Sequence, residues 1–318
     1  MRYRICLSVS TLDAEFQKMK DALEKVADVV VEGLENIDLS GCDIFIGKKL
    51  SKTALKTADK LKAVFAYKTG VDDFPLEQFK KMGVIVMNSH ADAKYIAEYA
   101  CGLGISLLNR ITEFDKKMRK GIWYDDRNPY WRSIFDTKIG LLGYGHIGKS
   151  IHKVLKHNNI ATYTVDRGKK YEDINLVSSV EDLCRECDLI IVSLPKTKQT
   201  DNIFNKDTIK LLKDKYIVNV GRSNCIDHKA LYESLRHEHM AGAAIDTWDK
   251  KPRKSDEIFF PADSQHSLYE LENVVISPHQ AMRVSVGHAR YVEDTLNKVL
   301  DYIKDGTVRD VVNLDLGY

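Results

Sequence analysis

The stretch that decides the fold is TKIGLLGYGHIGKSIHKVL, residues 137–155. It contains a G-x-G-x-x-G string directly after an apolar run and directly before a helical pattern, which is the context that a dinucleotide-binding turn requires. The first glycine allows the tight bend, the second lets the backbone approach a pyrophosphate, and the third lets the helix pack on the strand. N–H groups at the start of the helix then face the phosphates. The residues predicted to bind the cofactor here are Gly143, Gly145, His146, Ile147 and Gly148.

The next apolar run, ATYTVD, ends in an acid that favours NAD over NADP. This acid, Asp166, lies 18 residues after Gly148. A carboxylate at this position accepts hydrogen bonds from the ribose hydroxyls and repels a 2′-phosphate. Arg167 follows directly and weakens the preference, because a guanidinium pairs well with phosphate. We therefore predict NAD as the cofactor, with Asp166 and Arg167 beside its adenosine ribose.

The composition predicts a globular protein that binds neither nucleic acid nor a membrane. Of the 318 residues, 44% are hydrophobic and 30% are charged, which is typical of a globular chain of about two domains. The net charge of +2 lacks the basic excess of a nucleic-acid-binding protein. The sequence has no uncharged apolar run of about 18 residues, so we expect no membrane partner. Six scattered cysteines do not form a disulfide framework, so we expect a cytoplasmic protein with reduced thiols.

Short apolar runs alternate with helical patterns, which predicts βαβ units and parallel sheets with helices on both faces. Two such series flank a long helical pattern, residues 93–119, which we expect to be weakened locally by its glycines at 102 and 104. The chain after about residue 284 has one amphipathic helix and no strands, so we expect it to pack back on the first series. The predicted fold class is α/β with two doubly wound parallel-sheet domains, flavodoxin-like (1–93 and 284–318) and Rossmann (94–283). The expected strands lie within residues 4–10, 28–33, 43–47, 63–68, 84–88, 138–143, 161–166, 188–194, 216–221, 242–248 and 273–278.

Seven segments, in order along nearly the whole chain, resemble the D-isomer-specific 2-hydroxyacid dehydrogenase family. The resemblance implies an NAD-dependent oxidoreductase that transfers hydride between the nicotinamide cofactor and a small 2-hydroxy or 2-oxo acid. It also implies a discontinuous substrate domain, a central nucleotide-binding domain, and a homodimer with the long helix in its interface. The segments are TGVDDFPLEQFKKMGVIVMN, YIAEYACGLGISLLNR with RKGIW, KIGLLGYGHIGKSI, LPKTKQTDNIFN, VNVGRSNCIDHKALYESL, GAAIDTWDKKP and NVVISPH.

The same resemblance assigns roles to single residues. Arg222, in VNVGR, matches the arginine that binds the substrate carboxylate and keto oxygen, and a guanidinium suits bidentate binding of an α-oxo acid. His279, in SPH, matches the acid–base histidine, and its side chain titrates near neutral pH. The further substrate-binding candidates are the turn Thr69, Gly70 and Val71 with the adjacent Lys68, and the further cofactor-binding candidates are Pro195, Thr200 and Asp246.

One catalytic position departs from the family pattern. The family has a glutamate that pairs with the histidine immediately before a proline, and this chain has Lys251 before Pro252. A neighbouring ammonium lowers a histidine pKa, whereas a carboxylate raises it. Three interpretations stay open: another acid (Asp249, Asp256 or Glu257) replaces the glutamate, Lys251 binds a second anionic group of an unusual substrate, or the protein is a catalytically impaired NAD(H)-binding or cofactor-sensing family member.

Overall fold

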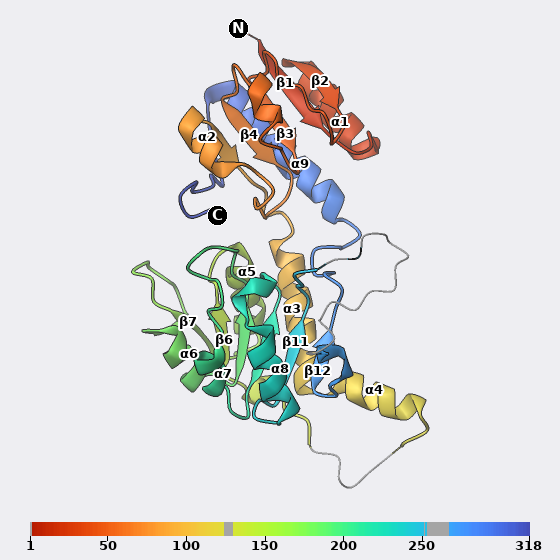
Figure 1. Cartoon of the computed structure of the whole chain (residues 1–318), viewed down its shortest axis with the longest axis vertical. Coiled ribbons are helices and arrows are strands. Elements are labelled where there is room, and N and C mark those ends of the chain that lie inside the picture. The colour runs from red at the N-terminus through yellow and green to blue at the C-terminus, as the bar shows by residue number, and fades with distance from the viewer. Residues whose placement is uncertain (1, 124–129, 251, 253–266) are drawn as a thin grey trace. The chain divides into compact units, whose positions relative to one another are not determined.

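The computed structural model describes residues 2–123, 130–250, 252 and 267–318. Contacts divide the chain into two compact units (Figure 1). Unit 1 consists of Met1–Asp92 and Val284–Tyr318, and unit 2 consists of Ala93–Arg283. No helix in the described part of the chain is long and apolar enough to cross a lipid bilayer.

Unit 1 contains a five-stranded parallel sheet in the order β2-β1-β3-β4-β5. This is the flavodoxin-like order, in which the direction of winding reverses between β1 and β3. Strands β3 and β4 are buried along their whole length, as expected of parallel strands covered on both faces. The strands are β1 (Tyr3–Ser8), β2 (Ala27–Glu32), β3 (Ile44–Gly47), β4 (Ala63–Ala66) and β5 (Ile85–Met87).

Helices from both ends of the chain complete unit 1. Helix α1 (Ala14–Glu24) begins at Asp13, whose carboxylate accepts hydrogen bonds from the N–H groups of Glu15 and Phe16. Helix α9 (Gly287–Asp305) packs against α1 and β4, and Figure 1 shows it in blue beside the red and orange strands. The C-terminal segment therefore belongs to the core of unit 1. The remaining helices of this unit are α2 (Leu76–Met82) and the 3₁₀ turn η1 (Ala54–Thr57).

Unit 2 contains a seven-stranded parallel sheet in the order β12-β11-β10-β9-β6-β7-β8. Counted from its own first strand this is the Rossmann order 3-2-1-4-5-6 with one strand added, so the predicted pair of doubly wound sheets is confirmed. Strand β8 was not predicted, because it is three residues long and its first two residues are exposed. The strands are β6 (Ile139–Leu142), β7 (Thr162–Val165), β8 (Asn175–Val177), β9 (Leu189–Val192), β10 (Tyr216–Asn219), β11 (Gly242–Ile245) and β12 (Val274–Ile276).

The single helix predicted over residues 93–119 is wrong, because the structure has two helices there. The break lies at Arg110, whose φ of +56° is left-handed, and both glycines lie inside the first helix. An ion pair of 2.5 Å between Arg110 and the buried Glu113 stabilises the start of the second helix. The helices of unit 2 are α3 (Ala93–Leu108), α4 (Ile111–Arg119), α5 (His146–His157), α6 (Val180–Glu186), α7 (Lys206–Lys210) and α8 (His228–Arg236), with 3₁₀ turns η2 (Ile134–Asp136), η3 (Ser223–Cys225) and η4 (Leu268–Glu270).

Candidate active site

The glycine-rich turn connects β6 to α5 and is closed too tightly for larger residues. Gly143 has a φ of +104°, and a Cβ atom there would lie 2.9 Å from the Oγ of Ser193. That hydroxyl donates a hydrogen bond of 3.0 Å to the carbonyl of Gly143, so the turn is tied to the end of β9. At Gly148 a Cβ atom would lie 2.0 Å from the same carbonyl oxygen. Both positions therefore require glycine.

The outer side of this turn is open, as a phosphate-binding turn must be. Gly145 is exposed, and apart from its own chain neighbours no described atom lies within 4 Å of the position that its Cβ would occupy. It begins α5, and no described side chain caps the first N–H groups of that helix. His146 is exposed and Ile147 half-buried in the first turn. An uncapped helix start beside open space fits the pyrophosphate of a dinucleotide.

The ribose-binding candidates follow β7. Asp166 and Arg167 are both exposed at its carboxyl end. The Oδ1 of Asp166 accepts a hydrogen bond of 2.8 Å from the N–H of Gly168, which orders the bend of the chain after the strand. The acid is thus held at the position that the G-x-G-x-x-G pattern predicts for it.

The loop after β9 is organised by Thr200. This residue is buried, and its hydroxyl donates a hydrogen bond of 2.7 Å to the carbonyl of Pro195. The same oxygen accepts a hydrogen bond of 2.9 Å from the N–H of Thr197. Thr200 therefore shapes this loop, because its hydroxyl bonds to the backbone of Pro195 and Thr197.

Arg222 follows β10 and is positioned by a buried amide that the sequence interpretation missed. Asn219 is fully buried, and its Nδ2 donates a hydrogen bond of 3.0 Å to the carbonyl of Arg222. Its Oδ1 accepts 3.0 Å from the N–H of Gly221. Arg222 itself is half-buried and donates from Nη1 to the carbonyl of Gly221 at 3.0 Å. Asn219 thus fixes the backbone that carries the guanidinium, and its place at a strand end, two residues before a glycine, is the signal that could have found it.

His279 lies just after β12 in an unusual backbone conformation, with a φ of +59°. Asp246, at the end of β11, holds the residues that follow it. Its carboxylate is fully buried and accepts hydrogen bonds from the N–H groups of Gln280 at 2.8 Å and Ala281 at 3.1 Å. We predicted Asp246 to contact the cofactor, and what the structure shows is that its carboxylate fixes the turn after His279.

The residues before His279 are held as well. The indole Nε1 of Trp248 donates 2.8 Å to the carbonyl of Ser277, and the hydroxyl of Tyr99 on α3 lies 2.7 Å from the Oγ of Ser277. The backbone on both sides of the histidine is therefore fixed by side chains from α3 and the end of β11. Neither Trp248 nor Tyr99 was predicted, since which side chain meets this turn depends on the packing of three elements.

Lys251, Asp256 and Glu257 lie outside the described residues. Asp249, the other acid considered as a replacement for the family glutamate, is exposed and accepts a hydrogen bond from the hydroxyl of Ser223. Ser223 directly follows Arg222, so Asp249 is held beside the turn that carries Arg222.

In unit 1, the predicted substrate-binding turn follows β4. The backbone of Thr69 is fixed from β5, because the Nδ2 of Asn88 donates 2.6 Å to its carbonyl. Val71 is buried, whereas Lys68 and Gly70 are half-buried. The ammonium of Lys68 pairs with Asp73 at 2.5 Å, so its nearest anionic partner is its own loop.

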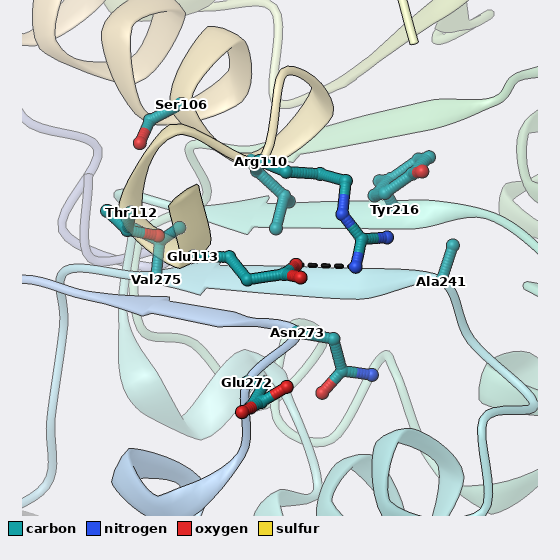
Figure 2. Close-up of a pocket in the computed structure, with 10 residues that line it drawn as sticks. Ser106, Arg110, Thr112, Glu113, Tyr216, Ala241, Glu272, Asn273 and Val275 are labelled. Carbon is teal, nitrogen blue, oxygen red and sulfur yellow. Dashed lines mark ion pairs between the residues drawn. The ribbon is translucent and has the colours of Figure 1, made fainter. Parts of the chain in front are cut away.

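An open pocket in unit 2 is not part of this candidate site (Figure 2). Its lining includes Tyr216, at the start of β10, and Asn273, just before β12. These positions mark the amino ends of the strands, whereas Gly143, Arg222 and His279 follow carboxyl ends. Figure 2 shows the Arg110–Glu113 ion pair inside this pocket.

Residues 101–281 match the family described as "D-isomer specific 2-hydroxyacid dehydrogenase, NAD binding domain". A glyoxylate reductase from Pyrococcus horikoshii is 27% identical over 290 residues, covering 86% of this chain and 82% of that protein. A D-3-phosphoglycerate dehydrogenase from Methanocaldococcus jannaschii is 28% identical over 309 residues, covering 92% of this chain and 56% of that protein. A crystal structure of a Pyrococcus horikoshii protein superposes with a TM-score of 0.84 at 25% identity, covering 98% of this chain and 96% of that one.

The family match spans more than half of the chain, and it covers the glycine turn, Asp166 and both catalytic candidates, Arg222 and His279. The two relatives match most of this chain, and they are named as a reductase and a dehydrogenase. The catalytically impaired alternative therefore finds no support. The chain therefore belongs to the D-isomer-specific 2-hydroxyacid dehydrogenase family and is an NAD-dependent oxidoreductase of 2-hydroxy and 2-oxo acids.

Proposed function

We propose that the protein reduces a small 2-oxo acid to the corresponding 2-hydroxy acid, with Arg222 binding the substrate and His279 supplying the proton. The observation that carries this proposal is the common edge of the unit 2 sheet. Gly143, Arg222 and His279 each follow the carboxyl end of a strand, and β6, β10 and β12 belong to one parallel sheet. In open α/β sheets this edge is where ligands bind.

Arg222 is suited to orient the substrate. Its guanidinium keeps its charge at every working pH and offers two parallel N–H donors to a carboxylate. Asn219 fixes the backbone beneath it, so less freedom is lost when the acid binds. From the family resemblance we also propose that the turn Thr69, Gly70 and Val71 binds substrate through its N–H groups, with the half-buried Lys68 beside that turn.

His279 is assigned as the acid that protonates the carbonyl oxygen. When bound, NADH supplies the hydride that adds to the carbonyl carbon. The open outer side of the glycine turn and the exposed Asp166 fit this cofactor. The hydrogen bonds that Asp246 and Trp248 make on either side of the histidine hold in place the backbone that carries the ring. We expect Arg167 to lie beside the adenosine ribose of the bound cofactor, and the loop with Pro195 and Thr200 to lie on the cofactor side.

The proposed substrate is a 2-oxo acid with either one or two anionic groups. The names of the two relatives indicate glyoxylate, which has one carboxylate, and D-3-phosphoglycerate, which also has a phosphate. Lys251 stands where the resemblance places a glutamate, and two roles remain for it. Either another acid serves the histidine, for which the described candidate is Asp249, or Lys251 binds the second anionic group of a dianionic substrate.

The test is oxidation of NADH by a panel of 2-oxo acids between pH 5 and 9. The panel contains glyoxylate, pyruvate, 2-oxoglutarate and 3-phosphohydroxypyruvate. We expect turnover of at least one acid, and a loss of about a hundredfold or more in kcat/KM for Arg222→Ala and for His279→Ala. NADH binding, measured by fluorescence, stays within about threefold in both variants.

Matched controls are Arg236→Ala and His237→Ala, which remove the same residue types from the exposed end of α8 and should leave the rates unchanged. A preference for the dianionic acids supports the second-anion role of Lys251. Tight NADH binding without turnover of any acid across this pH range would contradict the proposal.

We also propose that the protein is a cytoplasmic homodimer. All six cysteines are free and buried, which suits a reducing compartment. Helix α4 presents Ile111 and Met118, which are 50% and 52% exposed, on one face together with Phe114. An exposed apolar face of this kind is typical of a contact between copies.

A further inference from the structure

Asp92 is a buried acid that the proposed mechanism does not use. It is the last residue of the first segment of unit 1, and its side chain is 1% exposed. Its Oδ1 lies 3.0 Å from the hydroxyl of Thr69, and its Oδ2 has no hydrogen-bond partner among the described residues. No lysine, arginine or histidine in the described part of the chain forms an ion pair with it. A carboxylate in these surroundings would carry an uncompensated buried charge.

The hydrogen bonds of Thr69 indicate which atom carries the proton. Its hydroxyl has one hydrogen and lies 2.8 Å from the carbonyl of Ser89, which can only accept. If Thr69 donates to that carbonyl, the contact with Asp92 requires a donor on the acid. A protonated carboxyl group supplies this donor, so the geometry fits a neutral Asp92 that donates to Thr69.

The groups around Asp92 favour the neutral form. The hydroxyl of Tyr291, on α9, lies 3.3 Å from that of Thr69 and faces the acid. The buried ammonium of Lys298, also on α9, is paired with Asp294 and Asp310 at 2.7 Å each. Burial raises the pKa of the Asp92 carboxyl above its usual value, and the nearby hydroxyls of Tyr291 and Thr69 only partly oppose this.

We propose that Asp92 is a positioning residue that acts through Thr69: as a neutral acid it donates a hydrogen bond to the Thr69 hydroxyl and keeps the turn 69–71 able to bind the substrate carboxylate. When Asp92 ionises, the hydroxyl of Thr69 turns from Ser89 to the new carboxylate. A negative charge then lies behind a turn that must attract an anion. This inference rests on the substrate-binding role assigned to Thr69, Gly70 and Val71.

The test compares Asp92→Asn, which keeps a donor and cannot ionise, with Asp92→Ala, which has no donor. In wild type we expect KM for the 2-oxo acid, and Kd for the unreactive analogue oxamate in the presence of NADH, to rise about tenfold or more as pH increases from 6 to 9. In Asp92→Asn we expect KM and the Kd for oxamate to rise only about twofold over the same pH range. In Asp92→Ala, KM is raised about tenfold at every pH, while kcat stays within about twofold. Asp21→Asn, on the exposed surface of α1, is the matched control.

Thermal unfolding gives a second readout that does not depend on activity. A carboxyl group with a raised pKa stabilises the fold at low pH, and this contribution is lost as pH rises through the folded-state pKa. Asp92→Asn should therefore melt about 2 °C or more above wild type at pH 8 and equal it near pH 4.

Two results would overturn the assignment of Asp92: the same pH dependence of oxamate binding in wild type and Asp92→Asn, or an Asp92→Asn variant that behaves like Asp92→Ala. Should Asp92→Ala fail to fold, Thr69→Val and Thr69→Ser replace it, and only the serine variant should keep the wild-type pH dependence. If Arg222→Ala loses activity while Asp92→Asn keeps the wild-type pH dependence of oxamate binding, the proposed function stands and only this inference is refuted. A wild-type protein that binds neither oxamate nor any 2-oxo acid would instead contradict the proposed function.

Discussion

Trp248 shows how a single polar atom fixes a catalytic candidate. Its ring is 9% exposed and belongs to the core of unit 2, so most of the side chain serves packing. The indole N–H donates 2.8 Å to the carbonyl of Ser277, two residues before His279. Phenylalanine would keep the packing and lose the donor. The two tasks of this side chain can therefore be separated by one substitution.

We predict that Trp248→Phe lowers kcat about three- to tenfold and leaves the KM for NADH within about twofold. The reason is that a buried hydrogen bond contributes about 1 kcal/mol, and its loss frees the backbone before His279 from one side. Steady-state kinetics with the best acid of the panel measure the effect. The control is Trp131→Phe, whose ring is 56% exposed. An unchanged kcat would mean that Asp246 and Tyr99 fix the turn without this hydrogen bond.

The sequence predicts those parts of the site whose residues lie close together in one short motif. Gly143 and Gly148 are recognisable from the spacing alone. The chain bends at Gly143, and α5 starts so soon after the bend that Gly148 lies against the carbonyl of Gly143. Asn219 and Asp92 were not found, because the groups they bind are chosen by packing and not by spacing. The resemblance located Asp246, yet its hydrogen bonds to Gln280 and Ala281 follow from how two neighbouring strands end.

At the scale of elements, the strands were predictable because buried parallel strands are continuous apolar runs. Strand β8 escaped notice because it is a short edge strand that is mostly exposed. The break between α3 and α4 escaped notice for another reason. Arginine rarely takes a φ of +56°, and here an ion pair with the buried Glu113 stabilises that conformation.

Helix α5, which begins at the glycine turn, is joined to β7 by a buried histidine. The Nδ1 of His152 lies 2.7 Å from the hydroxyl of Thr162, and the ring is 8% exposed. Burial lowers the pKa of this imidazole below its usual value, and the nearby Lys156 lowers it further. The folded state therefore holds His152 neutral at a pH where an unfolded chain would protonate it.

We predict that acid weakens the wild-type fold more than that of His152→Gln. Because the folded-state pKa is lowered, the stability is fully present above the unfolded value of about 6.5 and is lost as pH falls through the folded-state pKa. Melting curves between pH 7.5 and pH 5 should show a fall about 2 °C larger in wild type than in His152→Gln. His157→Gln, at the exposed end of the same helix, should match wild type. Parallel falls in all three proteins would show that another group governs the response to acid.

At the scale of the whole molecule, the chain leaves unit 1 after Asp92 and returns to it at Val284. The return was predictable, since a single amphipathic helix after the last strand needs another surface to bury its apolar face. Helix α9 buries Tyr291, Val292 and Val299 in the core of unit 1. The same helix carries Lys298, whose ammonium donates 2.8 Å to the carbonyl of Asn88, so the C-terminal segment supports the turn at Thr69.

Helix α4 allows the proposed homodimer to be tested, because its two faces have different tasks. One face carries Glu113, which is buried and paired with Arg110 and Lys117, and these ion pairs stabilise the helix itself. The other carries Ile111 and Met118, which are separated by two helical turns and half exposed. Substitutions on the second face therefore change the surface without breaking the ion pairs that keep α4 folded.

We predict that wild type sediments as a dimer and that the double variant Ile111→Glu, Met118→Glu sediments as a monomer. Burying two carboxylates in an apolar contact costs several kcal/mol, which exceeds what a contact of ordinary size can lose and remain bound at micromolar concentration. Analytical ultracentrifugation measures the mass, and circular dichroism confirms that the variant is folded. The control, Val26→Glu with Met82→Glu, places the same charges on apolar side chains of unit 1 that are 42% and 41% exposed, and should stay dimeric. A dimeric α4 variant would place the interface elsewhere, and a monomeric wild type would contradict the dimer itself.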